Sequence, residues 1–507
     1  MKTIIISVLT LTIILTSLVS CEDALEEKVY SSLLSNTAFK TEEDASAAVI
    51  ATYRALRSIG YNYYQANYLR ATDAASDQGS ENGSDMQLGT WSDNTSVIQG
   101  MWQDCYGLIG AANFALNALS QVDMDQALKD RYEGEVKFLR ALGYYDATFH
   151  FGDVIINLGE NESGDDLPLS PQSEVIAAIL ADLEFAANAL PEMSQYGATD
   201  IGRACKGAAL ALKAKTNLNA GNWQAAADDA LLVINSGEHD MSLPYTELFK
   251  RENINANEFV FCMKSNESGD KNTVPKTYIS IYTLHETAQS GAWGVEISST
   301  VGLYKSYDLN DDRRKLFANG YQWKQREWNP ASPRPYYAIP GTPEYTDPGP
   351  FPGQQIYNLL DAPVIKYVRP RGLAVGGTSH DGGLNFPIIR YADVVLTRAE
   401  ALNELQGGSQ EAINLVNQVR RRAKIADLPS GLNQIQLRDA ILEERGKELF
   451  LEGKRRIDLI RHNKLIPLWK ASLEARYPDV DFSYITKETH TYYPIPLLEK
   501  NVNDEIN

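Results

Sequence analysis

The sequence predicts a mainly α-helical fold, a scaffold of stacked helix pairs interrupted by one long, irregular, loop-rich region. Three observations predict it. Apolar residues recur at helical spacing through most of the chain. Two stretches, 202–235 and 390–423, repeat the same helix–turn–helix pattern. Between 255 and 386, Gly, Pro, Asn and aromatic residues replace that pattern. With 507 residues, 44% of them apolar, the chain is long enough to bury a large core.

The first twenty residues have the organisation of a secretory signal. Lys2 precedes an apolar run over 4–19, and the small residue Ser20 leads into Cys21. A cysteine at this place resembles a bacterial lipobox, which implies a mature protein that begins at Cys21 and carries acyl chains on its sulfur. The alternative, a transmembrane anchor, fits less well because a run of about 16 residues is short for a bilayer.

Residues 21–40 are expected to form a polar tether after the lipidated Cys21. Acidic residues follow the cysteine at once, beginning with Glu22 and Asp23. This pattern resembles the export tag that sends some lipoproteins of Bacteroidetes-type bacteria to the outer face of the outer membrane.

Helices are expected in order along 41–254. Thr41 and Asp44 give the first one a capping sequence. The next has apolar members that include Trp102 and Phe114. The expected helices span 41–56, 97–119, 132–151, 171–190, 202–219 and 224–235.

The last two of these helices and the pair expected over 390–405 and 410–423 have the pattern of tetratricopeptide-like packing. Small residues face the partner helix at Ala208, Ala211 and Ala214, and again at Ala399 and Ala401. Such a pair has an apolar seam on each side, so it must stack on neighbours to bury both. We therefore expect one N-terminal part over 41–254 and one C-terminal part over 255–507.

The region 255–386 is the expected site of function. A long irregular insertion in a helical frame commonly carries binding residues. Disorder is the alternative, although many aromatic residues are available there for packing.

Composition and motif searches exclude several functions. The formal net charge of −19 argues against nucleic acid and against adhesion to an anionic lipid surface. Cys105, Cys205 and Cys262 are widely spaced, which favours buried free thiols, with one disulfide as the alternative. No two histidines have the spacing of a helical metal pair, and neither nucleotide-binding nor esterase motifs occur. We predict no metal, no cofactor and no enzyme, although two carboxylates suffice for a glycosidase.

Several motifs in a fixed order resemble the SusD/RagB family of outer-membrane nutrient-uptake lipoproteins. They lie at 134–135, 139–141, 151–153, 386–396, 399–404, 413–414, 419–423, 444–445, 448–449, 452–453, 455, 458–459, 461 and 494–496. The position after Arg455 is often aromatic in the family and is Arg456 here. The family pattern does not extend to the irregular region, so ligand specificity cannot be carried over.

The resemblance implies a SusD-like scaffold and a partner, a TonB-dependent SusC-like outer-membrane channel that the lipoprotein covers like a hinged lid. It also marks the charged C-terminal helices as scaffold. Independently, the spacing of Glu444, Glu448 and Glu452 predicts ion pairs that fix helix packing. A catalytic carboxylate there is the lesser alternative.

Exposed aromatic rings beside polar groups are the expected ligand contacts, because a sugar offers a C–H face to a ring and hydroxyls at its edge. Trp102 and Trp223 lie on helical patterns and are expected in the core. The stacking candidates are Trp91, Trp293, Trp323, Trp328, Tyr63 and Tyr64, and the polar candidates are Asp73, Asp77 and Arg326.

Together these observations predict a surface lipoprotein that captures an oligosaccharide or polysaccharide and delivers it to the channel. The first alternative is the same role for peptides. The second is a surface scaffold that binds another protein and transports nothing.

Overall fold

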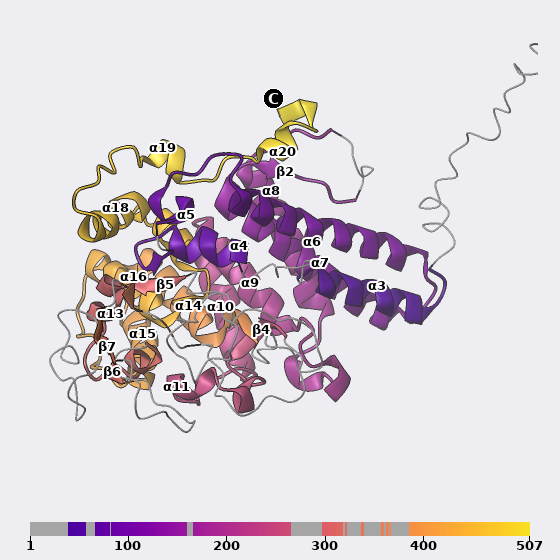
Figure 1. The fold of residues 1–507 in the computed structure, drawn as a ribbon. Helices are drawn as coiled ribbons and strands as arrows, with labels where there is room; N and C mark the ends of the chain where they lie inside the picture. Colours follow the sequence, from indigo (N-terminus) through magenta and orange to yellow (C-terminus); the bar gives the residue numbers. More distant parts are fainter. Residues whose placement is uncertain are drawn as a thin grey trace, which may run out of the picture.

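The computed structural model shows a mainly helical protein, which confirms the predicted fold class (Figure 1). It describes residues 39–56, 66–81, 83–159, 166–264, 297–317, 320–321, 336–338, 356–358, 361–362, 364, 366 and 385–506. Within them, no helix has the length and apolarity that a bilayer crossing requires. Residues 1–38, with the predicted signal, Cys21 and most of the tether, lie outside the described part.

The helices begin and end close to the predicted positions. They are α3 (Glu42–Ala55), α4 (Ala66–Leu69), α5 (Asp85–Leu88), α6 (Ser96–Gln121), α7 (Gln126–Phe151), α8 (Gln172–Ala189), α9 (Lys206–Asn219), α10 (Trp223–Ser236), α11 (Tyr245–Leu248), α13 (Val301–Ser306), α14 (Tyr391–Gln406), α15 (Gln410–Arg422), α16 (Gln434–Glu448), α17 (Arg455–Arg461), α18 (Leu465–Arg476), α19 (Lys487–His490) and α20 (Leu497–Lys500). The predicted capping box of α3 is present, with Thr41 and Asp44 bonded reciprocally.

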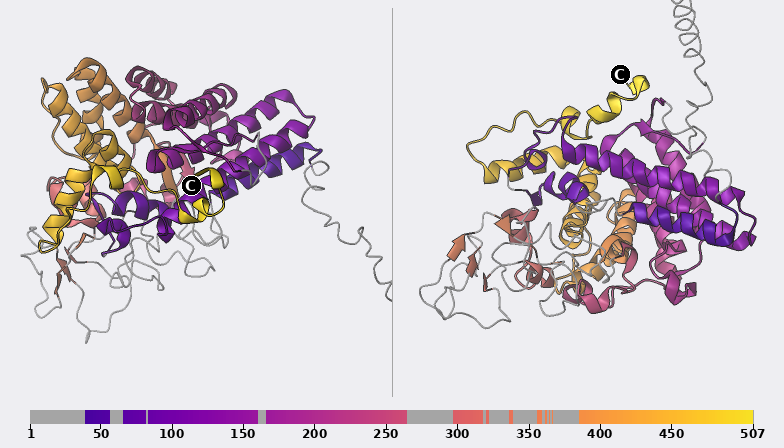
Figure 2. Two further views of the ribbon diagram at one scale, coloured as in Figure 1. Left: turned by 90° about the horizontal axis from the view of Figure 1, so that it is seen from above. Right: turned by 45° about the vertical axis from the view of Figure 1, so that its right-hand side comes forward.

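The long helices form one continuous array. Each of α6, α7, α8, α9 and α10 packs on the next, and α10 then packs on α14, which contacts both α15 and α16. Seen from above, this array runs in chain order from purple through magenta to orange (Figure 2). The two predicted helix pairs, α9–α10 and α14–α15, therefore stack on each other, as tetratricopeptide-like packing requires. The alanines predicted at their seams are fully buried. The division into parts at residue 255 stays a prediction.

The strands are short, and one buried pair frames the irregular region. They are β1 (Gly79–Ser80), β2 (Val154–Ile155), β3 (Leu169–Ser170), β4 (Phe259–Met263), β5 (Ser298–Thr300), β6 (Gly320–Tyr321), β7 (Tyr336–Ala338), β8 (Ile356–Asn358), β9 (Asp361–Ala362) and β10 (Phe386–Arg390). The sheets have the orders β1-β5-β9, β10-β4, β2-β3 and β6-β7-β8. β4 and β10 pair antiparallel with Phe386 opposite Met263, and all of their residues are buried.

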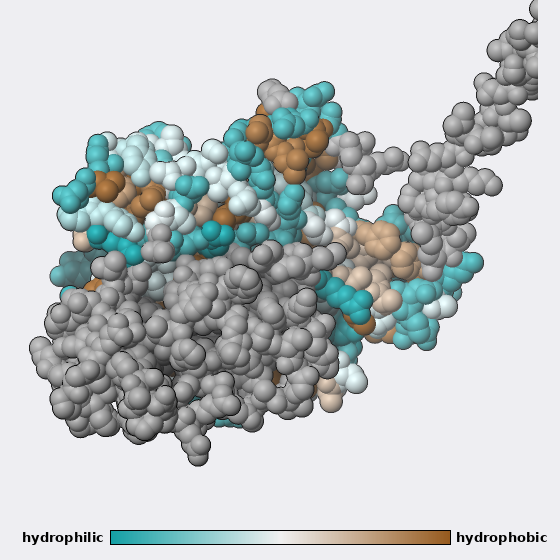
Figure 3. Space-filling view, viewed as in Figure 1, coloured by the Kyte–Doolittle hydropathy of each residue, from teal (hydrophilic) through white to brown (hydrophobic). Residues whose placement is uncertain are grey.

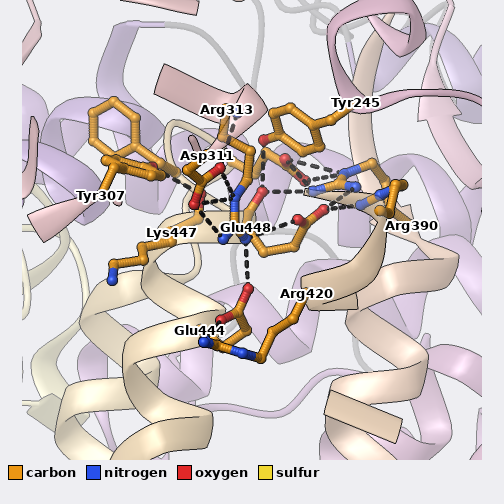
Figure 4. A network of polar contacts seen from close by, with 12 residues as sticks. Tyr245, Tyr307, Asp311, Arg313, Arg390, Arg420, Glu444, Lys447 and Glu448 are labelled. Atoms are coloured by element: carbon orange, nitrogen blue, oxygen red, sulfur yellow. Dashed lines mark hydrogen bonds and ion pairs between the residues drawn. The ribbon is translucent and has the colours of Figure 1, made fainter. Parts of the chain in front are cut away.

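A buried ion network holds the irregular region against the C-terminal helices (Figure 4). Nη1 of Arg390 donates to Glu258 at 2.6 Å and to Glu448 at 2.9 Å, and Nη1 of Arg313 donates to Glu444 at 2.6 Å. Burial alone would raise the pKa of Glu448, but Arg422, Arg390 and Arg313 lower it to about 2. The prediction that these charges fix packing is confirmed.

The remaining structural predictions have mixed outcomes. Cys105, Cys205 and Cys262 are buried free thiols, as expected. Trp102 lies in the core, and Trp223 is half-buried against a neighbouring core cluster. Phe114, an apolar member of the helix expected over 97–119, is 54% exposed, and its ring contacts Phe39 with centroids 5.4 Å apart.

Exposed apolar side chains gather on and after α20. Leu497, Leu498 and Val502 are 37%, 49% and 68% exposed. They lie in the brown patch near the C-terminus (Figure 3).

Candidate functional site

A surface cavity lies where the segment after α5 meets the segment around α19. These elements lie at the same end of the molecule as α18 (Figure 1). The cavity has a volume of about 730 Å³. Its lining residues are Gly89, Thr90, Trp91, Tyr484, Glu488, Thr489, His490, Tyr492, Tyr493 and Pro494. It is therefore built from chain segments nearly four hundred positions apart, and four of its side chains are Trp or Tyr.

Trp91 lines the cavity with a ring that is held by stacking. Its ring stacks on Trp469 of α18, with centroids 5.4 Å apart and planes 9° from parallel. Trp469 is fully buried, and its Nε1 donates to the Gln87 carbonyl at 3.1 Å. Gly89 brings the chain into this position with a φ of +73°, and a Cβ there would lie 3.0 Å from the Trp469 ring.

Arg456 of α17 lies behind the cavity wall and contacts two of its aromatic rings. It is fully buried, and its guanidinium carbon lies 4.5 Å from the Tyr493 ring centroid and 5.4 Å from that of Trp91. Nη1 donates to the Ala75 carbonyl at 3.0 Å and Nη2 to the His490 carbonyl at 2.6 Å. Within the described part of the chain no carboxylate pairs with it, so burial lowers its pKa. Aromatic faces and carbonyls compensate its charge instead.

His490 joins the two segments that form the cavity. Its Nε2 donates to the Gly89 carbonyl at 2.9 Å, and its Nδ1 accepts from the Thr486 amide at 3.2 Å. These partners define a neutral ring with the proton on Nε2. Burial lowers the pKa of His490, and the nearby Arg456 charge acts in the same direction.

The accessible part of the cavity combines flat rings with a polar rim. Tyr484 and Tyr492 are 42% and 38% exposed, and Trp91 is half-buried. Thr90, Glu488 and Thr489 are exposed at the rim. Rings that offer a face, next to hydroxyl and carboxylate groups, can stack on a sugar ring and bond its hydroxyls.

Two polar candidates have structural positions instead. Asp73 is fully buried in the π-helical turn Arg70–Ala74, where its Oδ2 accepts from the Gly453 amide at 2.9 Å. Burial raises its pKa to about 7. Asp77 holds Arg455 in a paired contact, with Nε at 2.8 Å and Nη2 at 2.7 Å. Neither position favours ligand contact, since Asp73 has no exposed surface and both oxygens of Asp77 accept from an arginine, so the predicted contacts stay predictions.

Of the predicted residues, the structure places Trp91 in the cavity. Trp293, Trp323, Trp328, Arg326, Tyr63 and Tyr64 lie outside the described residues, so those predictions stay open. Sequence reasoning missed Tyr484, His490, Tyr492, Tyr493 and the supporting Arg456. The signal available was the run from His490 to Pro494, which puts two tyrosines next to a motif already singled out.

The described residues contain no cluster of three or more His, Cys, Asp or Glu that could hold a metal ion. A helical array with an aromatic, polar-rimmed surface cavity is the arrangement of a small-ligand-binding protein built on tetratricopeptide-like helix pairs.

Comparison with known proteins identifies the family. A model described as "SusD family" matches residues 296–507, and one described as "Starch-binding associating with outer membrane" matches 23–218. The chain belongs to the SusD/RagB family, which confirms the resemblance seen in its motifs. The family consists of carbohydrate-binding proteins and not of enzymes, in agreement with the prediction, and its description includes association with the outer membrane.

Individual relatives cover nearly the whole chain. SusD-like protein P2 of Formosa agariphila is 29% identical over 483 residues, which cover 89% of this chain and 90% of that protein. The structure of a SusD homolog from Bacteroides thetaiotaomicron has a TM-score of 0.73 at 23% identity, covering 92% of this chain and 96% of the other. A structure titled laminarin binding SusD-like protein has a TM-score of 0.71 at 24% identity, covering 92% and 99%. These structures share the fold.

Proposed function

We propose that the protein captures an oligosaccharide or polysaccharide at the cavity formed by Trp91, Tyr484 and Tyr492. The observation that carries this proposal is the Trp91–Trp469 stack, which presents one half-buried ring to a cavity of about 730 Å³. Each ring that stacks on a sugar contributes roughly 0.5–1.5 kcal/mol beyond the area it buries, so affinity at one site is modest. Repeated units of a polymer raise it by avidity.

Calorimetry of the purified protein against a panel of glycans and peptide digests tests this proposal. We expect one glycan to bind, and Trp91→Ala to weaken binding by about tenfold or more. Trp223→Ala is the matched control, because it removes a half-buried tryptophan of α10 that does not line the cavity. Binding of peptides instead, lost in Trp91→Ala, would support the peptide alternative. Equal affinity of Trp91→Ala and wild type would reject this site.

The place of the protein in the cell forms the second part of the proposal. Acyl chains on Cys21 anchor it to the outer membrane with the domain facing the exterior, and it delivers glycan to a TonB-dependent SusC-like channel. The lipobox-like sequence and the family description support this. Cys21→Ser should release the protein from the membrane fraction, and wild type on intact cells should be accessible to added protease. Purification from membranes should recover the channel with it. A variant that stays in the membrane would contradict the anchor.

A further inference from the structure

A second cavity lies inside the scaffold, where α7, α9, α16 and α17 meet, away from the aromatic site. It has a volume of about 10 Å³, which is room for a single particle near the size of a water molecule. Its lining residues are Tyr68, Tyr145, Lys215, Leu218, Asn219, Arg445, Lys454, Ile457, Asp458 and Arg461.

The lining has many hydrogen-bond donors and few acceptors. Four cationic side chains reach it, against one carboxylate, Asp458. Both oxygens of Asp458 are engaged, Oδ2 by Nε of Arg445 at 2.8 Å and Oδ1 by Nη2 of Arg461 at 2.9 Å. The Asn219 amide oxygen accepts from Nη1 of Arg461 at 2.5 Å. These acceptors are therefore already taken by the surrounding arginines.

Arg445 has one donor group without a hydrogen-bond partner among the residues that the structure describes. The residue is 2% exposed. Its Nε is held by Asp458 and its Nη2 by Asp393, at 2.9 Å. Nη1 is buried and has no hydrogen-bond partner among the described residues. Because carboxylates hold the other two nitrogens, Nη1 is the one that remains available to an acceptor in the cavity that Arg445 lines. An unpaired donor on a buried charge is costly, so an acceptor in the cavity would stabilise the fold.

The carboxylates behind the lining are also engaged. Asp393 accepts from Lys215 at 2.5 Å and from Arg445. Both oxygens of Glu400 accept from Arg461, and His462 contacts it at 2.9 Å. Asp146 and Glu452 act on Lys454 electrostatically. Burial, followed by the nearby Lys215 charge, lowers the pKa of Lys454 to about 8, so its ammonium is charged at neutral pH.

We propose that this cavity binds one small monovalent anion of the size of chloride, held by Nη1 of Arg445 and the charges of Lys454 and Lys215. An ion that only accepts hydrogen bonds matches a lining of donors better than water, which must also donate. The ion joins helices of the first half of the chain to α16 and α17 and so stabilises the fold.

Bromide soaking provides the direct test. Crystals of the protein soaked in sodium bromide should give an anomalous peak inside this cavity. A water molecule in the cavity, with bromide at the surface only or nowhere, would overturn the proposal.

Thermal unfolding gives a second readout in solution. At equal ionic strength, chloride and bromide should raise the melting temperature progressively relative to gluconate, which is too large for the cavity. The halide effect should need about tenfold more salt, or vanish, in Lys454→Met. It should persist in Lys424→Met, which removes an exposed lysine paired with Asp312. Identical melting in all three salts would refute halide binding. If Lys454→Met does not fold, the crystal result alone decides.

Discussion

Replacing Arg456 by Met should loosen both the fold and the ligand cavity. The change removes the donors to the carbonyls of Ala75 and His490, at 3.0 and 2.6 Å, and a longer contact to Thr491 at 3.3 Å. A buried acceptor left without its donor costs about 1–3 kcal/mol. Two effects offset part of this loss: methionine fills much of the space of the arginine, and the fold no longer bears the free-energy cost of burying a guanidinium group. We therefore expect the free energy of unfolding to fall by about 2–4 kcal/mol.

The same variant should weaken the proposed glycan binding, because Arg456 packs against the rings of Trp91 and Tyr493, which line the cavity. Ordering a released side chain on binding costs about 0.5–1.5 kcal/mol, so two of them should reduce affinity by about 5- to 150-fold. Urea denaturation measures the first effect and calorimetry the second. Arg421→Met is the control, since the 62% exposed Arg421 pairs with Asp427 at the surface, where an ion pair contributes little to stability. If Arg456→Met matched this control in stability and affinity, the supporting role of the arginine would be refuted.

Three further predictions concern buried groups and one turn. In Asp73→Asn, the free energy of unfolding measured by urea denaturation should exceed that of wild type by an amount that grows by about 2 kcal/mol between pH 5.5 and 7.5. The reason is that the native pKa of about 7 makes ionisation of this buried carboxyl unfavourable above its ordinary pKa. If the difference between the variant and wild type did not change with pH, Asp73 would be ionised when buried. In the Asp73→Asn background, the free energy of unfolding should fall by about 1–3 kcal/mol as the pH drops from 7.5 to 5.5. Burial lowers the pKa of His150 to about 3 and that of His490 below 6.5, so the unfolded chain takes up protons before the folded protein does. A free energy of unfolding that did not change over this range would contradict neutral histidines in the fold. Gly89→Ala should lower the free energy of unfolding by about 1–2 kcal/mol and weaken glycan binding. Gly237→Ala, at φ +70° with open space around it, should lower stability by a similar amount and leave binding intact. Equal glycan affinity of the two variants would count against Gly89 as the residue that positions Trp91.

Helical periodicity was sufficient to locate most of the scaffold, because apolar spacing and caps are local properties of the sequence. α7 ends at Phe151, and the turn between α9 and α10 occupies residues 220–222, as expected. Phe114 shows the limit of this reasoning: an apolar residue at the correct helical spacing is still 54% exposed, because periodicity does not say which parts of a helix face the neighbouring helices.

The cavity was less predictable, because it depends on contacts between distant segments. Trp91 stood out as an aromatic residue in a polar loop, yet the ring that holds it belongs to Trp469 and the charge beneath it to Arg456. Asp73 was a candidate for ligand contact, and only the packing of the π-helical turn against Gly453 shows that its carboxyl is buried.

The pairing of β4 with β10 bears on how such a protein can diversify. Met263 and Phe386 lie opposite each other, so the intervening chain begins and ends at neighbouring points of the scaffold. Closing a longer loop between fixed ends adds only about 0.6 kcal/mol for each doubling of its length. Insertions and deletions between these strands are therefore inexpensive, provided that the part held by Arg313 is kept. A lineage can therefore lengthen, shorten or replace parts of this segment one at a time while the helical array remains the same.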